Sequence, residues 1–239
     1  MDNSQRQINL PDGMARMCVL ASRAFRALIF LHTENILTAV MPAWSNIAFI
    51  VAAYLIGGLS PGYWLARKRG GVDIREIGSG ATGATNAGRV LGKRGFYTVV
   101  LIDILKGFLV ALAASYFMAD SPPAWRCAAA YAVVAGHIWP VWLGFRGGKG
   151  VATFYGAWCP LAGGQGFIPA AICIVLALAL KPVFRRSFSV SWLVTHALFP
   201  VIAWWLWRDP ASTLICAAMI LTLWISHRAN ILAVLGKKA

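Results

Sequence analysis

Residues 96–118 read FYTVVLIDILKGFLVALAASYFM, an apolar stretch of membrane-spanning length that is interrupted by Asp103 and Lys106. A helix that crosses the hydrocarbon core of a bilayer needs roughly 17–25 mostly apolar residues. Asp103 and Lys106 lie three positions apart and hence on one face of that helix, where charged side chains are costly unless they are paired or functional. The stretch therefore predicts a transmembrane helix that carries either a buried Asp–Lys ion pair or part of a substrate site.

Apolar runs of this kind recur along most of the chain. Hydrophobic residues make up 59% of the 239 residues and charged residues only 13%, and the mean hydropathy is +0.66. Soluble domains usually contain about 25% charged residues, so this composition indicates a protein whose solvent is lipid. We predict an all-α, polytopic membrane bundle of about seven transmembrane helices, at residues 44–65, 96–118, 124–143, 151–162, 167–180, 188–207 and 211–226.

The positive charge is distributed unevenly over the predicted loops. The formal net charge is +14, but the basic residues flank apolar runs and form no separate polar face, which disfavours a nucleic-acid partner. The loops around 66–95, 144–150 and 227–239 are rich in Lys and Arg, whereas the short loops on the other side hold only Arg126 and Arg208. The positive-inside rule therefore predicts an outside N-terminus and an inside C-terminus for the core.

Residues 1–43 fit this orientation poorly, because Arg6, Arg16, Arg23 and Arg26 should resist export. Residues 17–31 are apolar but interrupted by two of these arginines, so they are typical of an interfacial helix at best. A signal peptide would need an uninterrupted apolar stretch. We expect residues 1–43 to be an N-terminal extension and 44–239 to be the membrane domain; translation that starts at Met41 is an open alternative.

Two loops on the predicted inside face combine glycine with polar and basic residues. The first reads Gly78-Ser79-Gly80-Ala81-Thr82-Gly83-Ala84-Thr85-Asn86 and is followed by Arg89, Lys93 and Arg94. Closely spaced glycines let backbone N–H groups approach an anion, and cations nearby neutralise its charge. A flexible linker would explain the glycines but not the interleaved Ser, Thr, Asn and Arg. The spacing matches neither a Walker A loop nor a dinucleotide-binding fingerprint.

The second loop reads Gly136-His137-Ile138-Trp139-Pro140 and then Phe145-Arg146-Gly147-Gly148-Lys149-Gly150-Val151-Ala152-Thr153. A Gly-Gly-Lys-Gly turn that opens an apolar helix is a plausible cradle for a phosphate or an oxyanion. His137 is either an acid–base group or a structural histidine beside the Trp-Pro turn.

Further polar residues lie on the same predicted face. Arg185, Arg186, Ser187, Ser189 and Ser191 enter the sixth predicted span, and His227, Arg228 and Asn230 follow the seventh. The five cysteines include no CxxC pair and favour a packing role. No cluster has metal-ligand spacing, so we expect neither a metal nor a cofactor.

Three motifs occur in one order and spacing: Gly78-Ser79-Gly80-x-x-Gly83-Ala84-Thr85-Asn86-x-x-Arg89-x-x-Gly92, Asp103-x-x-Lys106-Gly107, and Gly136-His137-x-x-Pro140 followed by Gly147 to Thr153. They resemble the signatures of the bacterial acyl-phosphate:glycerol-3-phosphate acyltransferase family, PlsY, over about residues 44–235. Three departures are visible: Ala81 replaces a usual Asn, Gly57-Gly58-Leu59-Ser60 replaces Gly-Ser-x-Pro, and an arginine and a glutamate usual near His227 are missing.

The resemblance implies a seven-span enzyme of the bacterial inner (cytoplasmic) membrane with its active site facing the cytoplasm. Such an enzyme transfers a fatty acyl group from acyl phosphate to the 1-hydroxyl of glycerol 3-phosphate and gives lysophosphatidic acid and phosphate in phospholipid synthesis. Its partners are the two substrates, membrane lipids and an upstream enzyme that makes acyl phosphate, with no nucleic acid.

The resemblance also implies the site residues. We expect the catalytic groups to be Ser79, Asn86, Lys106, Lys149, Ser189 and His227. We expect the substrate-binding residues to be Gly78, Gly80, Gly83, Thr85, Arg89, His137, Gly147, Gly148, Gly150 and Asn230. Because few carboxylates are available, the acyl phosphate itself could accept the proton of the attacking hydroxyl.

Two other functions stay open at this point. Short, glycine-interrupted spans beside basic residues also occur at the binding sites of transporters, so a transporter of small organic anions such as phosphate esters is one alternative. The absence of an inverted internal repeat argues against it. A divergent acyltransferase of low activity is the other, and Ala81 is the main residue that favours it.

Overall fold

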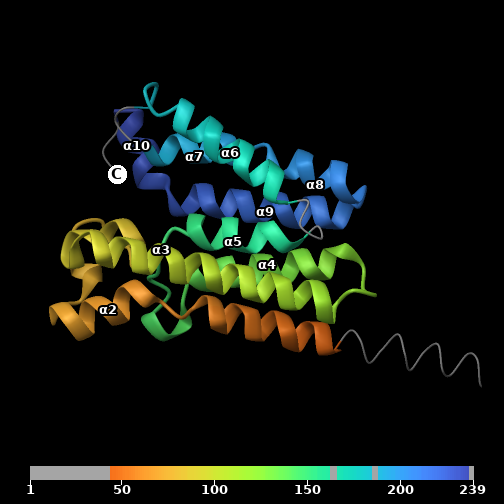
Figure 1. Cartoon of the computed structure of the whole chain (residues 1–239), viewed down its shortest axis with the longest axis horizontal. Helices are drawn as coiled ribbons and strands as arrows, with labels where there is room; N and C mark the ends of the chain where they lie inside the picture. Colours follow the sequence, from red (N-terminus) through yellow and green to blue (C-terminus); the bar gives the residue numbers. More distant parts are fainter. Residues whose placement is uncertain (1–43, 162–165, 185–187, 237–239) are drawn as a thin grey trace, which may run out of the picture. The chain divides into compact units, whose positions relative to one another are not determined.

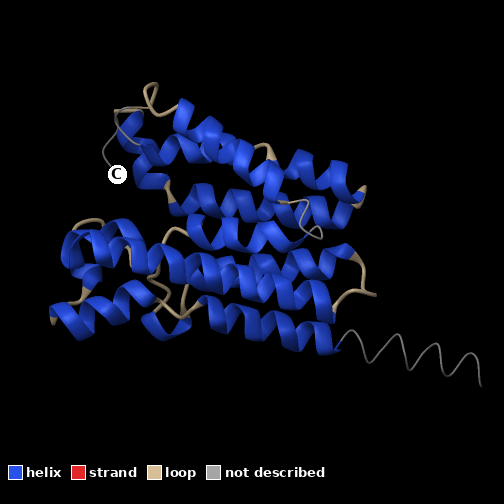
Figure 2. Cartoon of the chain, in the orientation of Figure 1, coloured by secondary structure: helices blue, strands red, loops and turns tan. Residues whose placement is uncertain are grey.

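The computed structural model describes residues 44–161, 166–184 and 188–236, and in these residues every regular element is a helix (Figure 2). The all-helical fold predicted from composition is therefore confirmed. The predicted N-terminal extension, the alternative start at Met41, and Arg185, Arg186 and Ser187 lie outside the described residues.

The first part of the bundle contains two breaks that hydropathy did not predict. A helix over residues 44–57 ends at a turn around Gly58, and the chain restarts at Pro61, whose fixed φ suits the first helical position. Gly92 has φ +69° and kinks the next long helix, which begins twelve residues before the predicted start of the second span at residue 96. These elements are α2 (Pro61–Gly70), the short 3-10 helix η1 (Ile74–Glu76) and α3 (Ala84–Phe117) (Figure 1).

The remaining elements follow the predicted segments closely. They are α4 (Pro123–Ile138), η2 (Val141–Leu143), α5 (Val151–Leu161), α6 (Phe167–Ala179), α7 (Phe188–His196), α8 (Phe199–Trp207), α9 (Pro210–Ser226) and α10 (Arg228–Val234). The predicted sixth span is thus two helices, α7 and α8, with Pro200 in the first turn of the second.

Each of the seven predicted segments contains helix, but the segments differ in length and continuity. Three stretches are long and apolar enough to cross a membrane: Trp44–Gly70, Ala84–Phe117 and Val190–Trp207. The pair α9 and α10, bent by 63°, becomes a fourth if it counts as one span. Helices α4, α5 and α6 are shorter than a full crossing, so the count of seven spans stays a prediction.

Glycine lets the central helices approach closely. A Cβ on Gly107 of α3 would lie 2.3 Å from the Thr153 carbonyl of α5, and one on Gly156 of α5 would lie 2.1 Å from the Ile104 carbonyl of α3. Gly57 and Gly136 form a similar reciprocal contact between the first helix and α4. Small residues at such contacts are typical of helix packing in membranes, where close van der Waals contact replaces the hydrophobic driving force.

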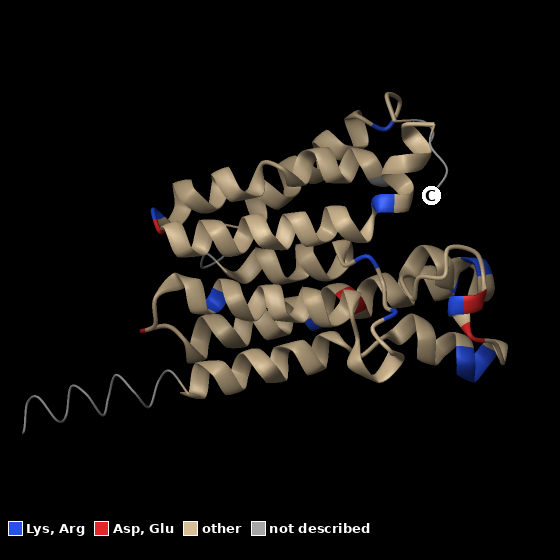
Figure 3. Cartoon of the chain, turned by 180° about the vertical axis from the view of Figure 1, so that it is seen from behind, with Lys and Arg blue, Asp and Glu red and all other residues tan. Residues whose placement is uncertain are grey.

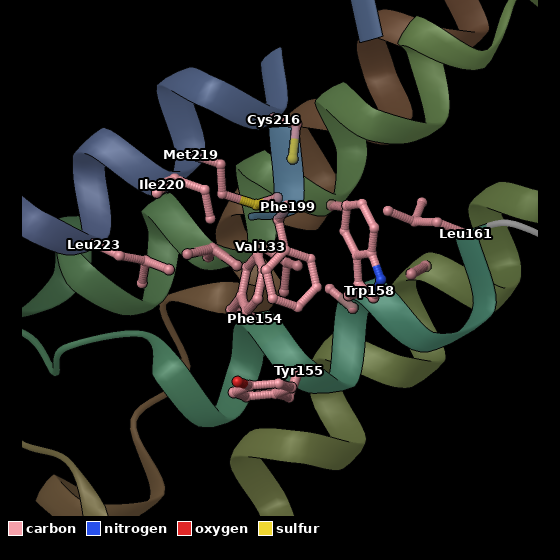
Figure 4. Packing of buried hydrophobic residues seen from close by; sticks show 14 of the residues in the cluster. Val133, Phe154, Tyr155, Trp158, Leu161, Phe199, Cys216, Met219, Ile220 and Leu223 are labelled. Carbon is pink, nitrogen blue, oxygen red and sulfur yellow. The ribbon is translucent and has the colours of Figure 1, made fainter. Parts of the chain in front are cut away.

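Aromatic rings fill the space between α5 and α8. The ring of Phe199 lies edge-to-face against Phe154 at a centroid distance of 4.8 Å and against Trp158 at 4.7 Å (Figure 4). All three side chains are fully buried. On the outside of the bundle, large apolar residues such as Leu101, Leu109 and Val201 are exposed, which suits a surface that faces lipid.

The charged residues gather at one end of the bundle. Most of the Lys and Arg residues, coloured blue in Figure 3, lie toward the end of the bundle near the C-terminus, and only a few lie at the opposite end. Figure 1 shows α2, the beginning of α3 and α10 at this same end. The first glycine-rich loop leads into α3, and the second, which joins α4 to α5, is hydrogen-bonded to the first, so the fold brings both loops to the basic end. The predicted membrane orientation rests on this asymmetry.

The orientation can be checked by labelling single cysteines in a background without the five native cysteines. We expect a membrane-impermeant thiol reagent to modify Asp120→Cys and Asp209→Cys in intact cells. We expect Arg69→Cys and Arg146→Cys to react only after the membrane is permeabilised, because the positive-inside rule places their loops in the cytoplasm. Modification of both groups from the same side would contradict the topology.

Candidate active site

The two glycine-rich loops touch each other directly. The Thr82 amide of the first loop donates a hydrogen bond of 3.1 Å to the Gly147 carbonyl of the second. Arg75, which precedes the first loop, donates from Nη1 to the Leu143 carbonyl at 3.0 Å. Segments that are separated by more than sixty residues in the sequence therefore form one polar surface at the basic end of the bundle.

The buried side chain of Asn86 holds the first loop in place through hydrogen bonds. Its buried side-chain amide nitrogen lies 2.9 Å from the Ile74 carbonyl, 2.8 Å from the Ile77 carbonyl and 3.0 Å from the Ala81 carbonyl. Its Oδ1 atom accepts from the Ser79 amide at 3.3 Å and from Arg89 Nη1 at 3.0 Å. Since both ends of the side chain are engaged, Asn86 shapes the loop, and a positioning role fits this geometry better than a direct chemical one.

Glycine at position 78 is required by this arrangement. Gly78 has φ +58°, and a Cβ there would lie 2.5 Å from Asn86 Oδ1 and 2.7 Å from Arg89 Nη1. Gly80 also has positive φ, and Gly83 immediately precedes α3. Ser79, Thr85 and Arg89 are exposed on the resulting surface. The loop therefore presents a hydroxyl pair and one guanidinium outward while its backbone is held from inside.

An interaction that supports the first loop, the ion pair of Arg75 and Asp73, was not predicted from the sequence. The Arg75 guanidinium forms an ion pair with Asp73, 2.6 Å between Nη2 and Oδ2, and its Cζ atom lies 5.0 Å from the centroid of the Tyr63 ring. The hydrogen bonds from Arg75 lower the pKa of Asp73 to about 2, so this carboxylate is ionised at any physiological pH. The sequence signal was the Asp-x-Arg spacing in a short turn, which is too common to be informative.

The second loop is seated on the end of α4. The Gly147 amide donates to the Ile138 carbonyl at 3.1 Å and the Gly148 amide to the His137 carbonyl at 3.0 Å. A Cβ on Gly147 would lie 2.2 Å from the His137 carbonyl oxygen, so only glycine allows this approach. Gly150 has φ +86° and leads into α5, as the predicted loop-to-helix pattern requires.

Lys149 extends from the second loop toward α10, near the C-terminal end of the chain. Its Nζ atom donates to Asn230 Oδ1, and its carbonyl accepts from Ser226 Oγ at 3.0 Å. Partial burial, and then the nearby positive charge of Arg89, lower the pKa of Lys149. Three residues predicted for the site, Arg89, Lys149 and Asn230, thus come together from three distant parts of the chain.

His227 lies beside this group but faces inward. It is buried, and its Nδ1 atom lies 2.9 Å from the Leu223 carbonyl and 3.1 Å from Ser226 Oγ. Ser189 belongs to α7, but its side chain is outside the part of the structure that is described. The catalytic roles of both residues stay predictions.

Lys106 does not point into this surface. Its Nζ atom lies 2.8 Å from Asp103 Oδ1, 2.9 Å from the Leu59 carbonyl and 2.9 Å from His137 Nδ1. An ammonium group has three hydrogens, and these three neighbours engage all of them. Lys106 therefore has no donor left for a substrate, and the ion-pair interpretation of Asp103 and Lys106 fits the structure better than a direct catalytic role.

The loop-forming role of Asn86 can be measured by hydrogen exchange. Asn86→Ala removes the partner of three carbonyls, one amide and a guanidinium, so we expect the amides of residues 74–81 to exchange at least about tenfold faster. Asn46→Ala, which removes one 3.0 Å bond to Ser121 Oγ, is the matched control and should leave these amides unchanged. Unaltered protection of residues 74–81 in Asn86→Ala would show that the loop is held by other contacts.

Comparison with known proteins identifies the family of the chain. A family model described as glycerol-3-phosphate acyltransferase matches residues 47–237, which include both loops and the C-terminal turn. The chain is 36% identical over 193 residues to the glycerol-3-phosphate acyltransferase of Prochlorococcus marinus (strain NATL2A), with 81% of this chain and 96% of the relative covered. It is 38% identical over 200 residues to glycerol-3-phosphate acyltransferase 1 of Desulfitobacterium hafniense (strain Y51), with coverages of 81% and 93%.

Solved structures show the same arrangement of helices. The crystal structure of PlsY, an integral membrane glycerol 3-phosphate acyltransferase, in its glycerol 3-phosphate form matches with a TM-score of 0.70 and 29% identity, over 82% of this chain and 94% of that one. The lysophosphatidic acid form of PlsY matches with a TM-score of 0.69 and 28% identity over the same shares. The chain belongs to the glycerol-3-phosphate acyltransferase family.

Proposed function

We propose that this protein transfers a fatty acyl group from acyl phosphate to the 1-hydroxyl of glycerol 3-phosphate and releases lysophosphatidic acid and inorganic phosphate. The observation that carries the proposal is the meeting of the two glycine-rich loops, with Lys149 and Arg89 close enough for their charges to interact. Both substrates carry phosphate, and a basic, glycine-lined surface suits two anions that must be held near each other.

Lys149 is the principal phosphate ligand in this scheme. Its charge stands between glycines at the start of α5, where backbone amides and a cation can converge on one anion. Arg89 supplies the second charge, and its orientation is set by Asn86 Oδ1. Burial, and then repulsion from Arg89, lower the pKa of Lys149, and an anion between the two cations would offset both effects, so substrate binding and the lysine charge favour each other.

The reaction itself needs little acid–base help from the protein. The 1-hydroxyl oxygen of glycerol 3-phosphate attacks the acyl carbonyl carbon, the bond from that carbon to the phosphate oxygen breaks, and the hydroxyl proton passes to the departing phosphate. Asp73 and Asp103 are both held in ion pairs and are poor candidates for a base. Positioning the two substrates can supply much of the acceleration, because the leaving group is already good.

The Ala81 departure bears on how active this member of the family is. Asn86 contacts residue 81 through its backbone carbonyl, and a residue of any type at position 81 would provide that carbonyl. Ala81 therefore does not remove this contact within the loop, and a low-activity variant gains little support from the loop geometry.

We place the enzyme in the bacterial cytoplasmic membrane with the loops facing the cytoplasm, because Lys and Arg are concentrated on the loop side. Residues 44–239 form the proposed acyltransferase domain, since the loops and their supporting helices all lie within them. An enzyme that makes acyl phosphate acts upstream, and no nucleic acid or metal takes part.

Donor choice tests the proposal directly. We expect the purified protein to form lysophosphatidic acid from glycerol 3-phosphate and acyl phosphate, and far less from acyl-CoA, measured with the same chain length. Equal rates from both donors would overturn the donor assignment. Flux of glycerol 3-phosphate across proteoliposomes, without product formation, would favour the transporter instead.

Replacement of Lys149 tests the phosphate site. Lys149→Ala removes a charge-assisted contact worth roughly 1.5–3 kcal/mol, so we expect kcat/KM to fall by about 10- to 150-fold. Lys149→Arg should restore only part of the activity, because a planar guanidinium needs more room than this turn between glycines provides. Lys68→Ala, at an exposed lysine on α2, is the matched control and should change little. Wild-type kinetics for folded Lys149→Ala would remove the residue from the site.

A further inference from the structure

The surroundings of the buried Lys106 ammonium determine which nitrogen of His137 carries the ring proton. Lys106 Nζ lies 2.9 Å from His137 Nδ1 and 2.8 Å from Asp103 Oδ1, and the three side chains are buried. The ion pair with Asp103 favours the protonated ammonium form of the lysine. An ammonium group has no lone pair, so it can only donate to Nδ1.

A neutral imidazole has one N–H and one lone pair. If Nδ1 accepts from Lys106, its lone pair is used, and the ring proton must be on Nε2. Asp103 Oδ1 also lies 3.3 Å from Nδ1 and would accept a hydrogen bond from an Nδ1–H. That alternative would set an N–H against the ammonium at 2.9 Å, which is repulsive, so Lys106 decides between the two tautomers.

The Nε2 side of the ring faces the second glycine-rich loop. A Cβ on Gly148 would lie 2.1 Å from His137 Nε2, so only glycine allows this part of the loop to pack against the Nε2 edge of the ring. The Gly148 amide also donates to the His137 carbonyl at 3.0 Å, which fixes the loop over the ring. Lys149 follows directly in the chain. The ring edge is therefore directed at the segment that holds the proposed phosphate ligand.

We propose that Lys106 and Asp103 are positioning residues that hold His137 in its Nε2–H tautomer, and that this N–H donates a hydrogen bond to the phosphate held by the Gly147–Gly150 loop. The arrangement gives the loop a neutral donor beside the charged Lys149, set by groups that never touch the substrate. The phosphate ligand rests on the proposed function, whereas the tautomer does not depend on it.

The tautomer can be read from the nitrogen resonances of the full-length protein labelled with 15N-histidine in detergent. The chain has four histidines, and the signals of His137 are those that vanish in His137→Gln. We expect a pyridine-like Nδ1 and a pyrrole-like Nε2. A pyrrole-like Nδ1, or a ring protonated on both nitrogens, would overturn the proposal from the wild-type spectrum alone.

Lys106→Met keeps the length of the side chain and removes its donors. Asp103 Oδ1, at 3.3 Å, should then accept from Nδ1, so we expect the tautomer to reverse to Nδ1–H. Lys68→Met is the control and should leave the spectrum unchanged. An unreversed tautomer in folded Lys106→Met would show that Lys106 does not set it.

Addition of glycerol 3-phosphate or inorganic phosphate to the wild-type protein tests the second half of the proposal. We expect the Nε2 proton to shift in wild type and to respond much less in Lys149→Ala. His137→Gln, whose carboxamide can place a donor near the Nε2 position, should keep most of the kcat/KM, whereas the shorter His137→Asn should lose about tenfold. An active wild-type enzyme whose Nε2 proton ignores both anions would refute this inference and leave the proposed function intact; an enzyme inactive with acyl phosphate would refute the function instead.

Discussion

The Lys106 ammonium lies inside the bundle and is held by three acceptors on three segments: the Leu59 carbonyl at the break after the first helix, Asp103 on α3 and His137 on α4. An unpaired charge at such depth is very costly, so these three segments can adopt only registers that bring their acceptors together. Because the His137 carbonyl accepts a hydrogen bond from the Gly148 amide and the His137 ring packs against Gly148, the same constraint fixes the second glycine-rich loop. The position of the proposed phosphate site thus follows from one buried cation.

The first loop is held by the neutral carboxamide of Asn86, and backbone and arginine hydrogen bonds join the two loops. This division has a chemical consequence. Asn86 and Lys106 use up their own hydrogen-bonding capacity inside the protein, so the surface that faces the substrates retains the exposed hydroxyls, backbone amides, Arg89, Lys149 and the proposed Nε2–H donor of His137. Such a surface can bind and orient two phosphate esters and stabilise developing negative charge, but it holds no free base of its own among the residues described here.

Much of this could be predicted from the sequence, because apolar runs fix where helices form in lipid and closely spaced glycines with basic residues fix where anions can bind. The break after residue 57 and the kink at Gly92 could not, since a hydropathy window averages over single turns. Lys149 and Asn230 were both assigned to the site, but their direct contact was not predicted. That contact depends on the bend between α9 and α10, which the sequence does not reveal. The position of Lys106 in an apolar stretch left an ion pair and a substrate role equally open, and the family resemblance implied a catalytic role; only tertiary structure shows that its donors are occupied.

The central claim is that Arg89, at the start of α3 beside the first loop, and Lys149 on the second loop bind the same phosphate. A double-mutant cycle of Arg89→Ala and Lys149→Ala, measured by kcat/KM with acyl phosphate and glycerol 3-phosphate, tests it most directly. Two cations that share one anion are coupled, so the double variant should differ from the product of the single effects by a coupling energy of at least about 1 kcal/mol. Additivity within about 0.5 kcal/mol would contradict the account, because it would mean that the two loops act on separate groups.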